Sequence, residues 1–337
     1  VDAIVFALVA VYFINIYFFQ NYTIPSSSLE KSLLVGDYLY VSKMSYGPRK
    51  PQTPLSMPLM QHTVPILGWK SYFEWPQWDY ERVSPKPVEL NDIVVFNYPA
   101  GDSVCLAPEY AAHDYYSLCY NFGERLCYQE YGALPPMSSL TPLQQRALYA
   151  AFYAKGSQYI KDNPMEFGRV GWRPVDRREN YVKRCVGLPG QTLEVKDHII
   201  YLDGKANKEP DNVQYSYRVK TSTAIFPYEL GEQLGLSHEQ VSELNASHTI
   251  PLTSKAKEAL AKCTQYVESI EYNHTSATDE CNQSLYPQNA FTGWTRDNYG
   301  PIWIPKKGET IELNLTNLPI YERPIAVYEG NTLEVTD

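Results

Sequence analysis

The apolar N-terminal stretch, residues 1–19, constrains the fold of this chain more than any other feature. Asp2 and Asn15 are its only strongly polar members. About 20 apolar residues in a helix cross the hydrocarbon core of a bilayer, so we expect residues 1–20 to form a transmembrane anchor. The alternatives are a buried helix or a cleavable targeting peptide. Targeting peptides have apolar cores of about 7–15 residues that end at a small-residue cleavage site, and polar residues follow here instead.

The distribution of charge indicates where the rest of the chain lies and what it does not bind. The first basic residue after the apolar stretch is Lys31, and a flank without a Lys/Arg cluster is typical of the non-cytoplasmic side of a membrane. The chain carries 29 Lys and Arg against 38 Asp and Glu, a net charge of −9. An acidic chain lacks the basic surface that nucleic acid requires, so we expect no nucleic-acid partner.

The segments beyond the apolar stretch favour a mainly β fold class with α+β insertions. Tyr (29) and Pro (25) are frequent, and aromatic residues suit pleated sheets whereas Pro interrupts helices. Residues 22–28 have the composition of an extended segment. Aromatic and β-branched strands are expected within 33–43, 91–99 and 181–205, with a hairpin turn at 203–204. We expect these pieces to form one antiparallel β core.

Two long segments of different composition interrupt this core. In the first, Thr141 is a predicted N-cap and Pro142 the first residue of a helix that runs to residue 162. The second contains two predicted helical runs, residues 237–244 and 254–270. The predicted divisions are the anchor (1–20), the first part of the β core (21–99), an insertion with a helix (100–175), the second part of the β core (176–214), a helical insertion (215–290) and a final β segment (291–337).

The six cysteines do not form a metal-binding pattern. There is no Cys-x-x-Cys pair and no closely spaced His that would complete a zinc site, so the spacing predicts neither a metal centre nor a cofactor. Outside the cytoplasm disulfides can form, and Cys263 with Cys281 is the pair that we would test first. Cys185 lies in an apolar run and is predicted to be a small buried hydrophobe.

Three consecutive serines, Ser26, Ser27 and Ser28, and Lys183 in a predicted strand could carry chemistry. A serine hydroxyl is a weak nucleophile and needs a base. No Gly-x-Ser-x-Gly motif or evident His/carboxylate partner is present. A lysine can act as the base if burial lowers its pKa toward about 7–8, because desolvation disfavours the ammonium. Alone, these residues are more typical of a solvated linker and a surface lysine.

The order of the segments adds information that the single residues lack. The apolar stretch is followed by IPSSSLEKSLLVGDYLYVSKMSYG (24–47), NDIVVFNYP (91–99) and YVKRCVGLPG (181–190). In this order they resemble bacterial type I signal peptidase, a family of membrane-anchored Ser/Lys proteases that remove targeting peptides from exported proteins. The likeness covers roughly a third of the chain. The two inserted segments resemble members with enlarged extracytoplasmic domains.

The resemblance implies a role for each serine and for the lysine. The family's Pro-Ser-x-Ser pattern makes Ser28 the nucleophile and Lys183 the general base. The oxyanion would be held by the backbone N–H of Ser28 and the hydroxyl of Ser26. In an extended chain residues 26 and 28 point to one side, so Ser27 is expected to point away.

The resemblance also implies the substrate, its binding site and its location. Signal peptides of exported preproteins would add a strand between residues 22–26 and 180–183. The protein would sit in the inner membrane of a bacterium, in contact with the lipid bilayer and with its catalytic domain on the periplasmic side. The oligomeric state is not predicted. The positions that match the family's shallow apolar pockets are Ile24, Pro25, Leu29, Leu33 and Val182.

Two features depart from the family pattern. Leu29 replaces the usual Met after the nucleophile, with similar volume. The family's Gly-Asp-Asn-Arg box is not in this sequence, which leaves Arg184 without an identified partner. Because the chain also starts at Val1 and ends where another strand is expected, we interpret it as a fragment with little or no activity.

Two other functions are compatible with parts of the sequence. Residues 230–244 have the spacing of a helix-turn-helix, and self-cleaving repressors also use a Ser/Lys pair. However, the second helix would offer Glu239 and Glu243 to DNA and no basic residue. A catalytically inactive membrane-anchored protein that binds peptides or partners is the other alternative, and Lys183→Ala would distinguish it from a protease.

Overall fold

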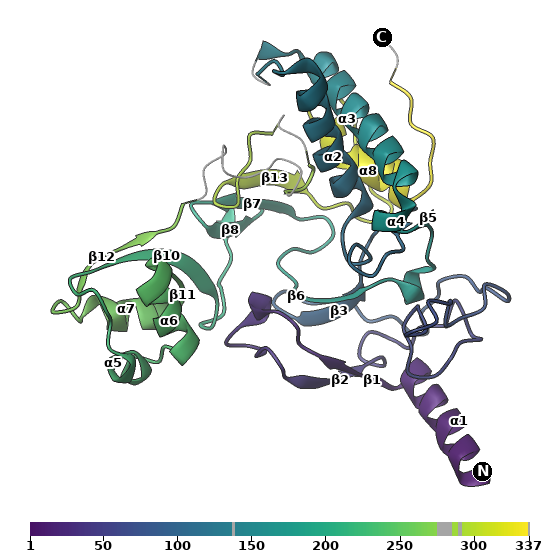
Figure 1. The fold of residues 1–337 in the computed structure, drawn as a ribbon, viewed down its shortest axis with the longest axis horizontal. Helices are drawn as coiled ribbons and strands as arrows, with labels where there is room; N and C mark the ends of the chain where they lie inside the picture. Colours follow the sequence, from purple (N-terminus) through teal and green to yellow (C-terminus); the bar gives the residue numbers. More distant parts are fainter. Residues whose placement is uncertain (137–138, 275–284, 289–291, 336–337) are drawn as a thin grey trace.

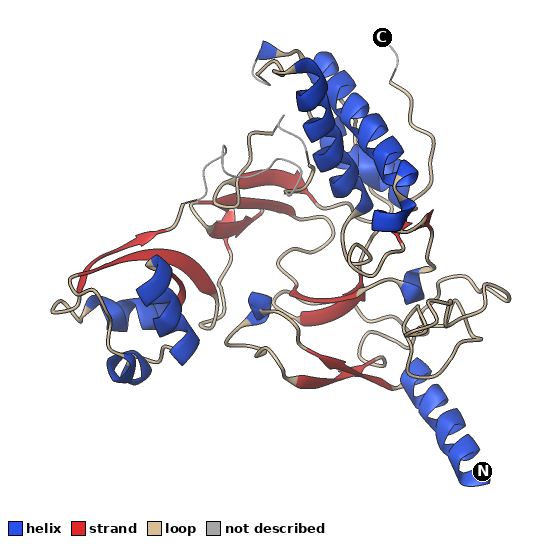
Figure 2. Cartoon of the chain, in the orientation of Figure 1, coloured by secondary structure: helices blue, strands red, loops and turns tan. Residues whose placement is uncertain are grey.

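The computed structural model describes residues 1–136, 139–274, 285–288 and 292–335. This part of the chain consists of antiparallel β-sheets and helices, as the predicted β-rich class requires (Figures 1 and 2). The strands are β1 Phe19–Thr23, β2 Tyr38–Ser42, β3 Ile93–Asn97, β4 Val104–Cys105, β5 Val170–Gly171, β6 Asn180–Arg184, β7 Thr192–Lys196, β8 Ile199–Leu202, β9 Lys205–Ala206, β10 Gln214–Thr221, β11 Thr249–Thr253, β12 Val267–Tyr272 and β13 Tyr299–Trp303. The α-helices are α1 Asp2–Tyr17, α2 Tyr115–Tyr131, α3 Pro142–Asp162, α4 Pro164–Phe167, α5 Tyr228–Gln233, α6 His238–Ser247, α7 Ser254–Ala261 and α8 Leu318–Arg323.

The N-terminal helix is shorter than the predicted anchor. α1 contains 16 residues, and the chain then continues as β1 because residues 19–23 pair with β2. Figure 1 shows α1 extending away from the rest of the molecule, with Ile4 67% and Phe6 75% exposed. Among the described residues, no helix is both long enough and apolar enough to cross a bilayer. The predicted transmembrane helix over residues 1–20 is therefore not supported.

The predicted β core is divided among separate sheets. β1 pairs with β2, and β3 pairs with β6, so that Val94 lies opposite Lys183. β7, β8 and β9 form successive hairpins, and β13 joins this sheet beside β7 from about 100 residues further along the chain. A cavity of about 900 Å³ lies among residues of α1, β1, β2, β3 and the loop between β2 and β3. The strands expected within 33–43, 91–99 and 181–205 are present as β2, β3, β6, β7 and β8, but they belong to three different sheets.

A second lobe is formed by β10, β11, β12 and the helices α5, α6 and α7 (Figure 1). Val241 and Leu244 of α6 are fully buried with Val219 of β10 in its core. α5 and α6 contain most of residues 230–244, which have the spacing of a helix-turn-helix. The predicted helix over 254–270 is wrong beyond α7, because the β-branched and aromatic residues of β12 pair with β10 instead.

The first insertion contains two long antiparallel helices. α3 begins at Pro142 with Thr141 as its N-cap, as predicted, and Gln144 completes a capping box. α2 was not predicted, because its many tyrosines and cysteines do not favour a helix by themselves. Gly123 of α2 and Gly156 of α3 allow the two backbones to approach closely.

The C-terminal segment returns to the helical pair rather than remaining a β segment. α8 was not predicted. Its Arg323 forms an ion pair with Asp114, the N-cap of α2, and donates to Gln288 Oε1 at 2.8 Å. Glu322 pairs with Arg146 of α3. The two ion pairs join residues 209 and 176 positions apart.

The cysteines of the described chain lie in different environments. Cys281 lies outside the described residues, and so does its predicted pairing with Cys263. Cys185 is half-buried, and its thiol lies 3.4 Å from the carbonyl oxygen of Gly187. The cysteines of the helical insertion and the adjoining strand, Cys105, Cys119 and Cys127, are buried.

Candidate active site

The structure brings Ser28 and Lys183 into direct contact. Ser28 lies in a single turn of 3-10 helix, Ser27–Leu29, directly after the segment that follows β1. Lys183 is held on β6 by pairing with β3. Its Nζ donates to Ser28 Oγ at 2.6 Å across 155 residues of sequence. This distance suits proton transfer between a hydroxyl and an amine.

The expected burial of Lys183 is wrong. Lys183 and Ser28 are both exposed, whereas the neighbouring Val182 and Arg184 are partly buried. Burial has a large effect on another lysine, Lys43, which lines the cavity between the first strands. Burial, assisted by the charges of Arg49 and Arg177, lowers the pKa of Lys43 to about 8. Contact with Ser28 and desolvation are therefore found at two different lysines.

The three serines do not continue the predicted alternation of an extended chain. Ser26 is extended, with φ −142° and ψ 154°, but the helical turn begins at Ser27. The period-two argument that separated Ser27 from Ser28 therefore fails, because successive side chains in a 3-10 helix are about one third of a turn apart. All three serines are exposed, so each hydroxyl can be reached by a ligand.

Arg184 has partners that the sequence did not reveal. Its Nη2 donates to Ser32 Oγ at 2.8 Å, and its Nη1 donates to the carbonyl of Asn91 at 3.0 Å. Asn212 Nδ2 also donates to Ser32 Oγ, at 2.7 Å. Ser32 closes the turn that begins at Leu29, to whose carbonyl it donates its N–H at 2.9 Å. These bonds tie the strand that carries Lys183 to the turn that carries Ser28.

The five predicted pocket residues differ in accessibility. Ile24 is only 4% exposed, and its backbone bonds to Gly36 and Asp37 in the adjoining turn. Its side chain therefore belongs to the packed interior rather than to an open pocket wall. Pro25 is exposed. The remaining three are partly exposed: Leu29, Leu33 and Val182.

Both strands of the predicted substrate site have few partners. Within the described part of the chain, β1 pairs with β2 alone and β6 with β3 alone. A strand with one partner presents unpaired N–H and C=O groups along its other edge. An extended peptide can bind such an edge by adding a strand.

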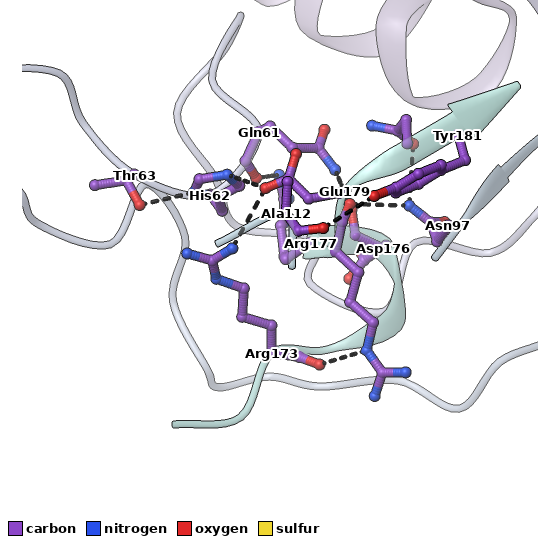
Figure 3. A network of polar contacts seen from close by, with 12 residues as sticks. Gln61, His62, Thr63, Asn97, Ala112, Arg173, Asp176, Arg177, Glu179 and Tyr181 are labelled. Atoms are coloured by element: carbon purple, nitrogen blue, oxygen red, sulfur yellow. Dashed lines mark hydrogen bonds and ion pairs between the residues drawn. The ribbon is translucent and has the colours of Figure 1, made fainter. Parts of the chain in front are cut away.

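A polar network fixes the start of β6 (Figure 3). The carboxylate of Glu179, the residue before β6, lies 2.9 Å from His62 Nε2 and 3.5 Å from Arg173 Nη1. The hydrogen bond with His62 lowers the pKa of Glu179, with a smaller contribution from Arg173. Asn97 of β3 donates to Asn180 Oδ1 at 3.0 Å. The network therefore secures the strand pair that positions Lys183.

Comparison with known proteins gives the family of the chain. A family model described as signal peptidase, peptidase S26, matches residues 1–255. The chain belongs to the peptidase S26 family. The matched region contains the predicted site residues of the chain, from Ile24 to Lys183.

Individual relatives resemble parts of this S26 peptidase. The chain is 28% identical over 125 residues to "Signal peptidase I" of Aquifex aeolicus (strain VF5). The matched residues make up 37% of this chain and 48% of that protein. The chain is 46% identical over 35 residues to "Signal peptidase I" of Bacillus licheniformis, covering 10% and 19%. The chain thus spans about half the length of the first relative and less of the second. No solved structure matches significantly.

Proposed function

We propose that this S26-family chain is a serine endopeptidase that removes N-terminal signal peptides from exported preproteins, with Ser28 as nucleophile and Lys183 as general base. The observation that carries the proposal is the 2.6 Å contact between Lys183 Nζ and Ser28 Oγ. Membership of the signal peptidase family and the names of the relatives support the same reaction.

In the proposed reaction a neutral Lys183 accepts the proton of Ser28 as Oγ attacks the scissile carbonyl. The backbone N–H of Ser28 and the hydroxyl of Ser26 would stabilise the oxyanion. Lys183 then gives its proton to the leaving amine, and water hydrolyses the acyl-enzyme with the same lysine as base. Because Lys183 is exposed, we propose that the bound substrate itself covers the amine and disfavours its charged form.

The proposed substrate binds as a strand beside β6, with its side chains directed at Pro25, Leu29, Leu33 and Val182. These apolar residues keep some exposed surface, which supports shallow pockets for small side chains. An A-x-A-like end of a targeting peptide has such side chains.

We propose that the protein acts at the periplasmic face of the bacterial inner membrane. Exposed apolar side chains on α1 support contact with lipid, among them Ile4, Phe6 and Phe13. Recovery of the protein in the membrane fraction, and its loss from that fraction when these three residues are changed to Ser, would support this location. Recovery outside the membrane fraction would contradict it.

Cleavage of a preprotein by the full-length protein tests the proposed chemistry. We expect Ser28→Ala to abolish cleavage and Lys183→Ala to slow it by about 10²–10⁴-fold, because a general base supplies about that factor. Ser27→Ala is the matched control, since Ser27 is also exposed and adjacent to the nucleophile, and its rate should remain close to that of the wild type. Unchanged processing by Lys183→Ala would instead favour a protein that binds exported peptides without cleaving them.

A further inference from the structure

His198, His274 and Asp297 form a cluster that their spacing in the sequence conceals. They come from the turn between β7 and β8, the second residue after β12 and the loop before β13. Their potential ligand atoms all lie within 4.8 Å of one another. We propose that these three residues bind a divalent transition-metal ion of the zinc type. The sequence predicts no metal centre because its Cys and His residues are not closely spaced. The three residues of this cluster are far apart in the sequence and meet only in the folded chain.

Two distances within the cluster are close to those around a tetrahedral zinc ion. Asp297 presents one oxygen to each imidazole: Oδ1 lies 3.0 Å from His198 Nδ1, and Oδ2 lies 3.4 Å from His274 Nδ1. Zinc bonds to N and O of about 2.0–2.1 Å place neighbouring tetrahedral ligands about 3.3–3.4 Å apart. Entry of a metal between these groups therefore requires only small side-chain movements.

The donor set selects the class of metal. Two imidazole nitrogens and one carboxylate suit zinc and neighbouring transition metals, whereas Mg²⁺ and Ca²⁺ prefer oxygen ligands. The side chains of His198 and Asp297 are 9% and 8% exposed, but that of His274 is 68% exposed. An ion could therefore enter beside His274, and water could complete its coordination.

His198 is held rigidly in an unusual conformation. Its φ is +71°, a left-handed region that Gly or Asn normally occupies in such a turn. Its ring stacks on Tyr272 with centroids 4.3 Å apart. Nε2 is buried without a hydrogen-bond partner among the described residues, so the polar contact of this ring is made through Nδ1. The ring is thus fixed with Nδ1 directed at Asp297.

The position of the cluster indicates a structural role for the metal. His198 belongs to the sheet of β7, β8, β9 and β13, whereas His274 follows the last strand of the β10–β12 lobe. An ion shared by the two would fasten the lobe to the sheet. A ligand that binds only the folded chain raises its stability in proportion to the logarithm of ligand concentration.

Metal binding by the full chain, without an affinity tag and after treatment with a chelator, tests this proposal. Calorimetric titration with Zn²⁺ should show one site, and Zn²⁺ but not Mg²⁺ should raise the midpoint of thermal unfolding. His274→Ala should weaken zinc binding at least about tenfold and remove the shift in the midpoint, because one ligand is lost. His274 is the preferred position, since its exposed side chain makes little packing contact.

Two further variants make the result specific. Asp297→Asn keeps the shape of the side chain and should also weaken zinc binding. His113→Ala is the matched control, because His113 is an exposed histidine of the helical insertion, beside Tyr110. It should bind zinc like the wild type. Absence of binding in the wild type, which would indicate hydrogen bonds only, or equal binding by His274→Ala and His113→Ala, would overturn the proposal.

Discussion

At the scale of single residues, Lys183 and Lys43 occupy opposite environments. Lys183 is exposed and donates to Ser28, whereas Lys43 is partly buried near two arginines, which lowers its pKa to about 8. A protease of the proposed kind needs a neutral lysine beside its serine. The structure has the contact with Ser28 at Lys183 and the desolvation at Lys43, and in the proposed reaction the bound substrate would desolvate Lys183.

The environment of Lys43 predicts a pH-dependent stability. Between pH 8 and about 10.5 the unfolded chain binds the proton that folded Lys43 has released, so the contribution of Lys43 to the free energy of unfolding rises with pH. Lys43→Met removes a charge that is unfavourable at neutral pH. We expect this variant to be more stable than the wild type by about 1–3 kcal/mol at pH 7, and the difference to disappear near pH 10.5.

Urea unfolding at pH 7, 9 and 10.5 measures this difference. The comparison between variants cancels the titration of the many tyrosines, which the two proteins share. Lys70→Met is the control for removing a lysine, since the Lys70 side chain is 50% exposed. If Lys43→Met were more stable than the wild type by the same free energy at all three pH values, packing rather than charge would cause the difference.

At the scale of elements, the pairing of α2 and α3 depends on two glycines. A Cβ added at Gly123 would lie 1.8 Å from the carbonyl oxygen of Phe152, and one at Gly156 would lie 1.8 Å from that of Cys119. Backbone atoms cannot move aside as the end of a side chain can. The distance between the helices is therefore set by the lack of a side chain at these positions.

We expect Gly123→Ala to destabilise the protein by about 1–3 kcal/mol, the usual range for overpacking, although Ala favours a helix more than Gly does. Gln129→Ala, on an exposed position of α2, is the control and should have a negligible effect. The free energy of unfolding in urea measures both. Stabilisation by Gly123→Ala would mean that the helices can separate at little cost.

At the scale of the whole molecule, the C-terminal segment is fastened to the helical insertion by charge. The side chains of Arg323 and Asp114 are 13% and 8% exposed. Asp114 also accepts from Tyr98 Oη at 3.0 Å and caps α2. The ion pair thus connects the last residue of α8 with the start of α2, and Asp114 in turn bonds the residue after β3.

Arg323→Met should leave the buried Asp114 without its cation. We expect a loss of about 2–4 kcal/mol, because removing one partner of a buried ion pair is costly and Asp114 keeps its other hydrogen bonds. Arg125→Met is matched, since Arg125 lies over the ring of Phe122 as Arg323 lies over that of Tyr116. Equal losses in urea unfolding would assign the effect to stacking instead of charge.

Local sequence was sufficient to predict those helices and strands whose structure is determined by neighbours along the chain. Thr141, Pro142 and Gln144 start α3 through contacts within one turn, and the β-branched and aromatic runs form β2, β3 and β6. It was insufficient for α2, for α8 and for the region after α7, where packing partners far away in sequence decide between helix and strand. Arg184 likewise found Ser32 only in the folded chain.

The sequence by itself determined the strands β2, β3 and β6, the family resemblance and the choice of Ser28 and Lys183 as candidates, because motifs and periodicity are local properties. Tertiary structure alone decided that Lys183 is exposed, that Lys43 is desolvated and that His198, His274 and Asp297 meet. The burial of a side chain, and the contact of residues far apart in sequence, depend on which distant segments pack together. A linear pattern of residue types does not contain that information.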